Sequence, residues 1–215
     1  MSDIMDFEKF GKIPRLSREV VVTEKIDGTN GQILIVDIPL SMLESKPAGA
    51  IETTYAFMLV GSRTRWLTHE LDNYGFWHWA YDNRDELIEL GEGRHFGEWW
   101  GSKIQRGYGL TNGERHFSLF NTGRWVDRQV GDVAVGTMKQ GQQFAPVCCR
   151  VVPILYTGEF DTKSIEFELH DLRCNGSRAA PGYMKPEGVV IFHTAANMSF
   201  KKTLEKDDKP KGGVE

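Results

Sequence analysis

Residues 19–37 read EVVVTEKIDGTNGQILIVD, and the expected architecture follows from this stretch. Its two halves, Glu19–Lys25 and Gln32–Asp37, are rich in β-branched and apolar residues, which favours strands. An Asp-Gly turn signal lies between them, so we expect a hairpin-like pair. Their nearly continuous apolar character indicates burial on both faces.

Further strands are expected along the chain, with two helices between them. The strand candidates are Phe57–Arg63, His95–Trp100, His116–Phe120, Val147–Tyr156, Gly188–His193 and Met198–Leu204. Apolar residues recur at helical spacing from Leu71 to Ile88 and from Ile165 to Leu172, where Asp161 is a suitable cap. Runs of strands with few helices predict an α+β fold with antiparallel sheets and flanking helices.

Length and composition bound the class of protein. A chain of 215 residues suffices for one large domain, which we expect over residues 1–204, followed by a charged, disordered tail over residues 205–215. No apolar run reaches the ~20 residues of a membrane span, and the acidic N-terminus is unlike a secretory signal, so we expect a cytoplasmic protein. The net charge of -4 argues against a basic coat for nucleic acid but leaves a local basic groove open.

Lys25 is the first candidate for chemistry. A lysine at the end of a buried strand becomes nucleophilic when desolvation or nearby cations favour its neutral amine. Asp27 lies two residues on and can share its face, and Gly28 permits close backbone approach to a ligand. Taken alone, the same residues are also typical of a surface hairpin tip.

The whole chain weighs against that simpler interpretation. KIDGTN at residues 25–30 resembles motif I of the covalent nucleotidyltransferases, which comprise DNA ligases, RNA ligases and mRNA capping enzymes. The remaining motifs of that superfamily follow in order. The segments that resemble motifs Ia, III, IIIa, IV and V are, in that order, SRTR (62–65), FGEWWG (96–101), FSLFN (117–121), EGVVI (187–191) and SFKK (199–202).

Within the superfamily, residues 24–30 and the GSRAAPG segment at 176–182 are most similar to the small phage-type RNA ligases, the RNA ligase 2 class. DNA ligases and capping enzymes usually carry Arg where Asn30 stands. The resemblance implies an ATP-grasp-like nucleotidyltransferase domain without an OB-fold domain. It also implies an ATP-dependent RNA ligase of RNA repair, acting through a covalent lysyl–AMP on RNA 5′-phosphate and 3′-hydroxyl ends.

The resemblance also implies roles for individual residues. Lys25 attacks the α-phosphorus of ATP, while Glu24 accepts from the adenine amino group and Phe120 stacks on its ring. Glu98 holds the ribose, and Glu187 binds Mg²⁺, with Mn²⁺ as an alternative. The remaining implied contacts to nucleotide, phosphate or RNA ends are made by Asp27, Gly28, Asn30, Arg63 and Lys201 or Lys202.

Two departures from the family pattern bear on these roles. Asn121 replaces the usual Asp of motif IIIa, and the two motif V lysines are adjacent. Neighbouring strand residues point to opposite faces, so only one lysine reaches the site directly, and we favour Lys201. The chain also ends soon after motif V, and the sequence leaves open whether a partner protein replaces the C-terminal domain of typical ligases.

Some alternatives stay open from sequence alone. A DNA ligase, a capping guanylyltransferase and a non-catalytic nucleic-acid-binding module share parts of the pattern. The four tryptophans at positions 77, 79, 99 and 100 fit core packing better than base stacking. RNA-backbone contacts by Lys103, Arg106 and Tyr108 are neither supported nor excluded.

Overall fold

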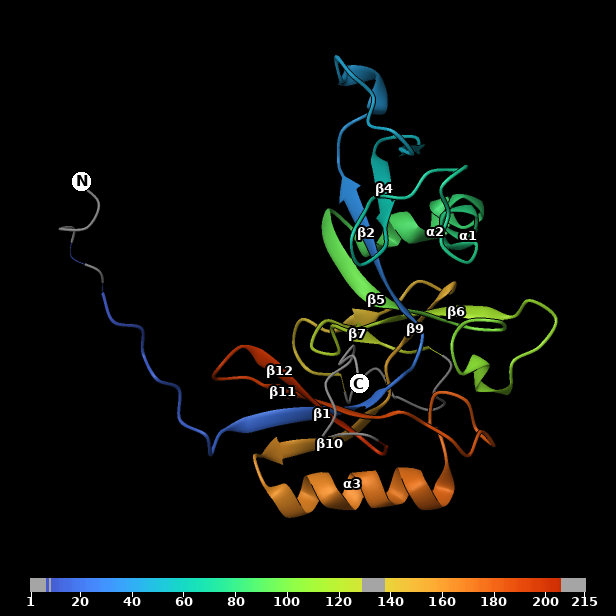
Figure 1. Ribbon diagram of the computed structural model, residues 1–215. Coiled ribbons are helices and arrows are strands. Elements are labelled where there is room, and N and C mark those ends of the chain that lie inside the picture. Colours follow the sequence, from blue (N-terminus) through green and yellow to red (C-terminus); the bar gives the residue numbers. More distant parts are fainter. Residues whose placement is uncertain (1–6, 8, 129–137, 206–215) are drawn as a thin grey trace.

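The computed structural model describes residues 7, 9–128 and 138–205, and it consists of two main sheets lying one above the other in the view of Figure 1. The lower sheet is antiparallel and has the order β10 (Ile154–Glu159), β1 (Glu19–Lys25), β11 (Gly188–His193) and β12 (Met198–Thr203). The helix α3 (Thr162–Asn175) covers its outer face.

The upper sheet contains six strands. Their order is β3 (Ile51–Glu52), β4 (Phe57–Gly61), β2 (Thr29–Val36), β5 (Gly93–Gly101), β6 (Arg115–Leu119) and β9 (Cys149–Val151), and only the β6–β9 pair is parallel. Its core packs against α1 (Phe76–Asp82) and α2 (Arg84–Leu87). The small remaining elements are β7 (Trp125–Val126), β8 (Gln143–Phe144) and the 3₁₀ turns η1 (Leu40–Met42), η2 (Ile88–Leu90) and η3 (Gly107–Gly109). The predicted α+β class with antiparallel sheets is confirmed.

The expected hairpin of β1 and β2 is wrong, because the two strands belong to different sheets. Residues 26–28 carry the chain from one sheet to the other. Ile26 is buried between the sheets beside Trp100 and Tyr108. At Gly28 the backbone lies so close to β5 that a Cβ atom would stand 2.4 Å from the Trp99 carbonyl oxygen. The turn is therefore a crossing point between two sheets.

Burial along β1 and β2 alternates and is not continuous on both faces. Val20, Val22 and Glu24 are buried toward α3, whereas Val21, Thr23 and Lys25 are half-buried. The Val147–Tyr156 strand is also divided, because β9 and β10 lie in different sheets and Pro153 stands between them. Proline has no N–H to donate to a ladder, which suits it to such a break.

The two helix predictions have different outcomes. The helix over Ile165–Leu172 is confirmed, and Asp161 caps it by accepting from the backbone N–H groups of Lys163 and Ser164 at 3.3 and 3.0 Å. The Leu71–Ile88 pattern instead yields a helix from Phe76 that is broken at Asn83, and Leu71 lies outside it. Within the described ranges, no helix is long and apolar enough to cross a membrane. The predicted tail lies outside the described residues except for Glu205.

Candidate active site

The predicted nucleophile is the last residue of β1 and forms an ion pair with the predicted metal ligand. Lys25 pairs with Gly188 at the start of β11, and Glu187 immediately precedes that strand. Lys25 Nζ consequently donates to Glu187 Oε2 at 2.5 Å, with side-chain exposures of 20% and 7%. Two residues far apart in sequence thus meet at the end of a sheet.

Gly188 permits this close arrangement of strands. It has a φ of +152°, and a Cβ atom there would lie 2.2 Å from the Lys202 carbonyl oxygen on β12. A side chain would push β12 away from β11. The glycine of motif IV therefore serves strand packing beside Glu187.

Glu98 of β5 is a second buried carboxylate in the candidate site, and it binds residues that follow Lys25. Its two oxygens accept from the Gly28 N–H and the Asn30 side-chain amide, each at 3.0 Å. Burial raises the pKa of Glu98 to about 7, and the negative charge of Glu187 adds to this, whereas the positive charge of Lys25 and both hydrogen bonds oppose it. Glu98 therefore connects motif I to the upper sheet. It also interacts electrostatically with Lys25 and Glu187.

Asp27 is held by residues that follow motif III. Arg106 Nε donates to Asp27 Oδ2 at 3.0 Å, and the Asp27 N–H donates to the Tyr108 hydroxyl at 2.9 Å. That hydroxyl lies 3.4 Å from the Lys25 carbonyl oxygen, to which it donates. Tyr108 is buried, and burial raises its pKa, so the hydroxyl keeps its proton. Sequence reasoning left Arg106 and Tyr108 open as RNA contacts and missed this support of motif I.

The sequence indicates only weakly that the segment around Tyr108 supports motif I. Tyr108 stands between Gly107 and Gly109 with a φ of +50°, and Lys103 and Gln105 also have positive φ. Such backbone is uncommon for residues with side chains and is found where surrounding contacts hold it. Closely spaced glycines around an aromatic residue were the available hint.

Glu24 faces α3, and its carboxylate binds the loop after that helix. It accepts from Ser177 Oγ at 2.6 Å and from the N–H groups of Arg178 and Ala179 at 2.7 and 2.9 Å. Burial raises the pKa of Glu24, and these hydrogen bonds oppose that shift. The structure thus brings the 176–182 segment against motif I. The contact between Glu24 and adenine stays a prediction.

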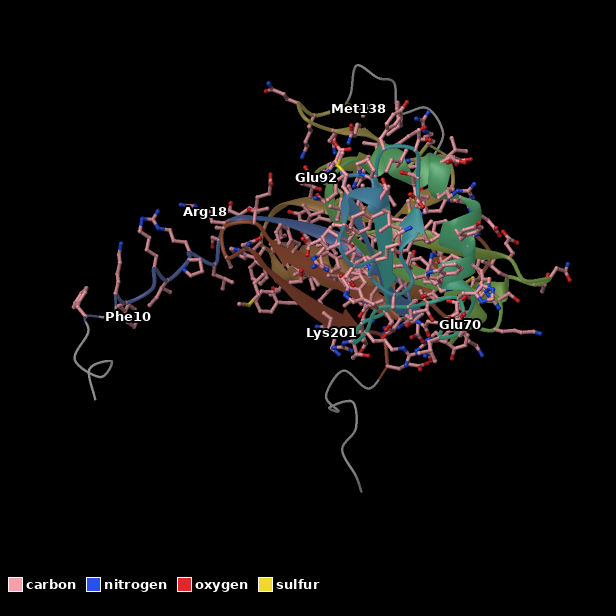
Figure 2. All side chains as sticks on the ribbon, turned by 90° about the horizontal axis from the view of Figure 1, so that it is seen from above. Phe10, Arg18, Glu70, Glu92, Met138 and Lys201 are labelled. Carbon is pink, nitrogen blue, oxygen red and sulfur yellow. The ribbon has the colours of Figure 1, made fainter. Side chains whose placement is uncertain are left out.

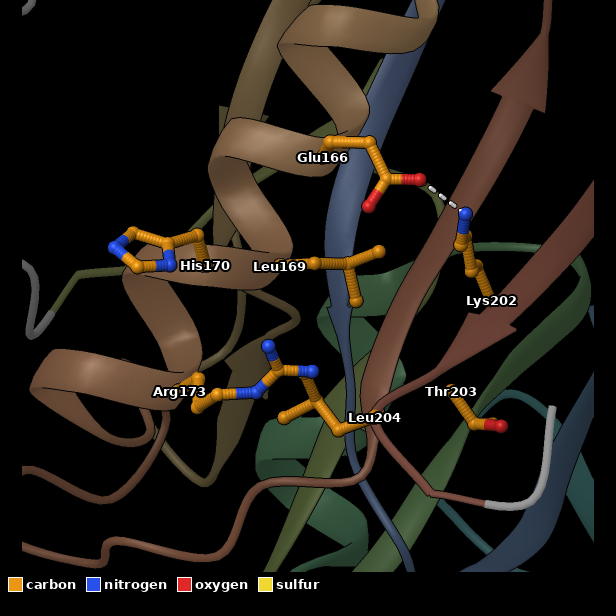
Figure 3. A pocket seen from close by; sticks show the side chains of 7 residues that line it. All are labelled: Glu166, Leu169, His170, Arg173, Lys202, Thr203 and Leu204. Atoms are coloured by element: carbon orange, nitrogen blue, oxygen red, sulfur yellow. Dashed lines mark hydrogen bonds and ion pairs between the residues drawn. The ribbon is translucent and has the colours of Figure 1, made fainter.

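The two motif V lysines lie on opposite faces of β12. Lys202 is in register with Val189 and Glu24 and forms an ion pair with Glu166 of α3, as Figure 3 shows. Lys201 is in register with Val190 and Thr23, so it shares the face of Lys25. Figure 2 labels Lys201 at the margin of the molecule, where its side chain is exposed. A pocket of about 330 Å³ between α3 and β12, which includes Lys202, lies on the α3 face and not on the face of Lys25.

The other predicted contacts lie on the upper sheet. Phe120 follows β6 and is 42% exposed, whereas Phe117 is buried in the core. Arg63 is exposed in the turn after β4. Asn121, the departure in motif IIIa, accepts from the Arg124 N–H at 3.1 Å and so stabilises the turn after Phe120. The four tryptophans pack in or against the cores as expected.

The carboxylates fit a hard divalent cation only in part. Among the described residues, no group of three or more His, Cys, Asp or Glu side chains could hold a metal ion. Mg²⁺ is commonly bound by one or two carboxylates together with substrate phosphates and water. The oxygens of Glu187 are suited to that mode, in which the phosphates complete the shell.

Comparison with known proteins shows the family and the fold. Residues 18–204 match the model of the RNA ligase family. Among solved structures, a Naegleria gruberi RNA ligase variant with ATP and Mn has 20% identity and a TM-score of 0.54, covering 88% of this chain and 51% of that one. A variant of the same ligase with AMP and Mn has 19% identity and a TM-score of 0.52, covering 87% and 50%. The chain therefore spans about half the length of these ligase chains, and at this identity the likeness concerns the fold. The search of curated proteins gives no match.

Proposed function

Because this chain belongs to the RNA ligase family, we propose that it is an ATP-dependent RNA ligase that forms a covalent lysyl–AMP on Lys25. In the first step Lys25 Nζ attacks the α-phosphorus of ATP, so that a P–N bond forms and the bond to pyrophosphate breaks. An oxygen of an RNA 5′-phosphate then attacks the same phosphorus, so that a phosphoanhydride bond forms, the P–N bond breaks and Lys25 is released. In the last step a 3′-hydroxyl attacks that activated end, forms the phosphodiester and releases AMP.

The position of Lys25 is the observation that carries the proposal. Its amine lies between the two sheets, paired with Glu187 and within the field of Glu98. Lys25 Nζ donates to Glu187 Oε2, and only an amine with a free lone pair is a nucleophile. The amine must therefore break this hydrogen bond to Glu187 before it attacks phosphorus.

The surrounding residues position the reactants and offset charge, which is how phosphoryl transfer is mainly catalysed. Glu98 fixes Gly28 and Asn30, while Tyr108 and Arg106 fix the turn after Lys25. Lys201, on the β12 face that it shares with Lys25, and Arg63, in the turn after β4, supply positive charge for phosphate oxygens. A divalent cation held by Glu187 would neutralise further phosphate charge.

The finer assignments extend this proposal. The motif I and 176–182 segments favour a phage-type ligase of RNA repair, with Phe120 against adenine and Asn30 near the RNA ends. Since the chain spans about half of its structural relatives, a further domain or partner protein would hold part of the RNA.

The test is incubation with each labelled nucleoside triphosphate and Mg²⁺, followed by a denaturing gel. We expect one labelled band with ATP alone, and loss of that band in Lys25→Ala. The matched control is Lys163→Ala, which removes an exposed lysine from α3. Labelling by GTP would point to a capping-type enzyme, and the absence of any label would point to a non-catalytic module. A ligation panel of RNA and DNA ends then separates an RNA ligase from a DNA ligase.

A further inference from the structure

Exposed aromatic side chains form a row across the upper sheet, beginning at Phe120. The backbone N–H of Phe120 donates to the Phe96 carbonyl oxygen at 3.0 Å, and Phe96 stands directly opposite Gln32 of β2. Gln32 in turn pairs with Gly61 of β4, which is bridged to Trp66. The three aromatic residues Phe120, Phe96 and Trp66 are 42%, 51% and 37% exposed.

This row lies on the face of the upper sheet that carries Glu98. Phe96 and Glu98 are two residues apart on β5, so their side chains share a face. A Cβ atom on Gly61 would meet both the Gln32 side chain at 2.8 Å and the Trp66 ring at 3.0 Å. Trp66 and Gln32 therefore lie side by side, and the row continues outward from the proposed nucleotide site.

Positive charge accompanies the aromatic row, although the chain as a whole is acidic. The Arg94 guanidinium stands 5.3 Å from the centre of the Trp66 ring and donates to Gln32 Oε1 at 2.8 Å. Arg63 and Arg65 lie in the turn that leads to Trp66, and both are exposed. Flat aromatic rings among guanidinium groups are suited to bases and phosphates together.

We propose that Phe96 and Trp66 bind unpaired bases of a single-stranded RNA end, beyond the position that Phe120 gives to the nucleotide. A ring can stack only on a base whose face is open, and in a duplex neighbouring base pairs cover both faces of internal bases. The row thus assigns single-stranded ends, and not a nicked duplex, as the preferred substrate class. The inference rests on the proposed function for the identity of the nucleic acid and for the reaction.

The experiment measures binding by fluorescence anisotropy, without ATP, of a 3′-labelled 12-nucleotide RNA that carries a 5′-hydroxyl. The same sequence in a nicked duplex is the comparison. We expect tighter binding of the single strand, and a loss of about fivefold or more in Trp66→Ala and in Phe96→Ala, the effect of removing one stacked base contact. Trp66→Phe should restore most of the affinity because a flat ring remains.

The matched control is Phe167→Ala, since Phe167 is a 65% exposed phenylalanine on α3 and away from this face. Thermal unfolding of each variant reports on folding. The inference would be overturned if both alanine variants bound the single strand as tightly as wild type. It would also be overturned if they lost as much affinity for the nicked duplex as for the single strand. In either case the aromatic row would be a contact for protein. Self-adenylation of the wild-type protein by ATP, measured without RNA, tests the proposed function separately, so either idea can fail while the other stands.

Discussion

Lys25 and Glu187 are 162 positions apart, yet their side chains meet at 2.5 Å because β1 ends beside the start of β11. The pair is largely buried, and Gly188 keeps β12 close beside it. The same carboxylate that we assign to a cation is thus the resting partner of the nucleophile.

Replacing Glu187 therefore changes both the charge near phosphate and the partner of Lys25. In Glu187→Ala we expect self-adenylation at saturating Mg²⁺ to fall at least about tenfold, or ~1.4 kcal/mol of transition-state stabilisation. Initial rates of AMP labelling over a range of Mg²⁺ concentrations measure the effect. Glu166→Ala, on α3, is the control. Identical Mg²⁺ dependence in Glu187→Ala and wild type would remove this residue from the proposed metal site.

The two motif V lysines offer a test of strand geometry. Lys201→Ala should slow self-adenylation about tenfold or more, because it removes positive charge from the face of Lys25. Lys202→Ala should affect mainly stability, and by less than about 1 kcal/mol, since its ion pair with Glu166 is substantially exposed. The measurements are labelling rates and chemical denaturation of both variants. A larger rate loss in Lys202→Ala than in Lys201→Ala would show that the register argument fails.

Local sequence patterns predicted single elements well. The β-branched run at 19–25 and the strand at 188–193 have the expected bounds, and Asp161 caps its helix. Strand pairing was not predictable in the same way, because β1 pairs with β10 and β11 from the far end of the chain. An Asp-Gly turn signal describes only the local backbone, so it could not distinguish a hairpin from a crossing between sheets.

The candidate site was likewise predictable only in part. Resemblance singled out Lys25, Glu98 and Glu187, and the fold brings these three together. It did not indicate Tyr108, because this side chain binds backbone atoms of motif I, and such contacts leave no charge pattern in the sequence.

The raised pKa of Glu98 predicts a pH-dependent stability. Its folded pKa of about 7 lies above the ordinary value of 4.5, so its contribution to stability is fully present below pH 4.5 and is lost as the pH rises through about 7. The shift corresponds to about 3 kcal/mol at most. Glu98→Gln should lose less unfolding free energy than wild type between pH 4.5 and 8. Urea denaturation across this range measures the difference, and parallel pH profiles of the two proteins would contradict the assignment.

Tyr108→Phe tests whether the segment after motif III positions the nucleophile. The variant keeps the buried ring but removes the hydroxyl that accepts from the Asp27 N–H and donates to the Lys25 carbonyl. An N–H left without its partner in this part-buried turn should cost about 1–3 kcal/mol of unfolding free energy.

The turn that aims Lys25 also loosens, so we expect a lower kcat for self-adenylation with little change in KM for ATP. The pH profile of kcat should keep its shape, because the raised pKa of Tyr108 keeps its hydroxyl protonated in wild type. Tyr183→Phe is the matched control, since the Tyr183 ring centre lies 4.7 Å from that of Tyr108 and its hydroxyl donates to the Arg106 carbonyl oxygen at 3.5 Å. A loss of stability with an unchanged kcat would show that Tyr108 supports the fold alone, and a shifted pH profile would show that its hydroxyl takes part in proton transfer.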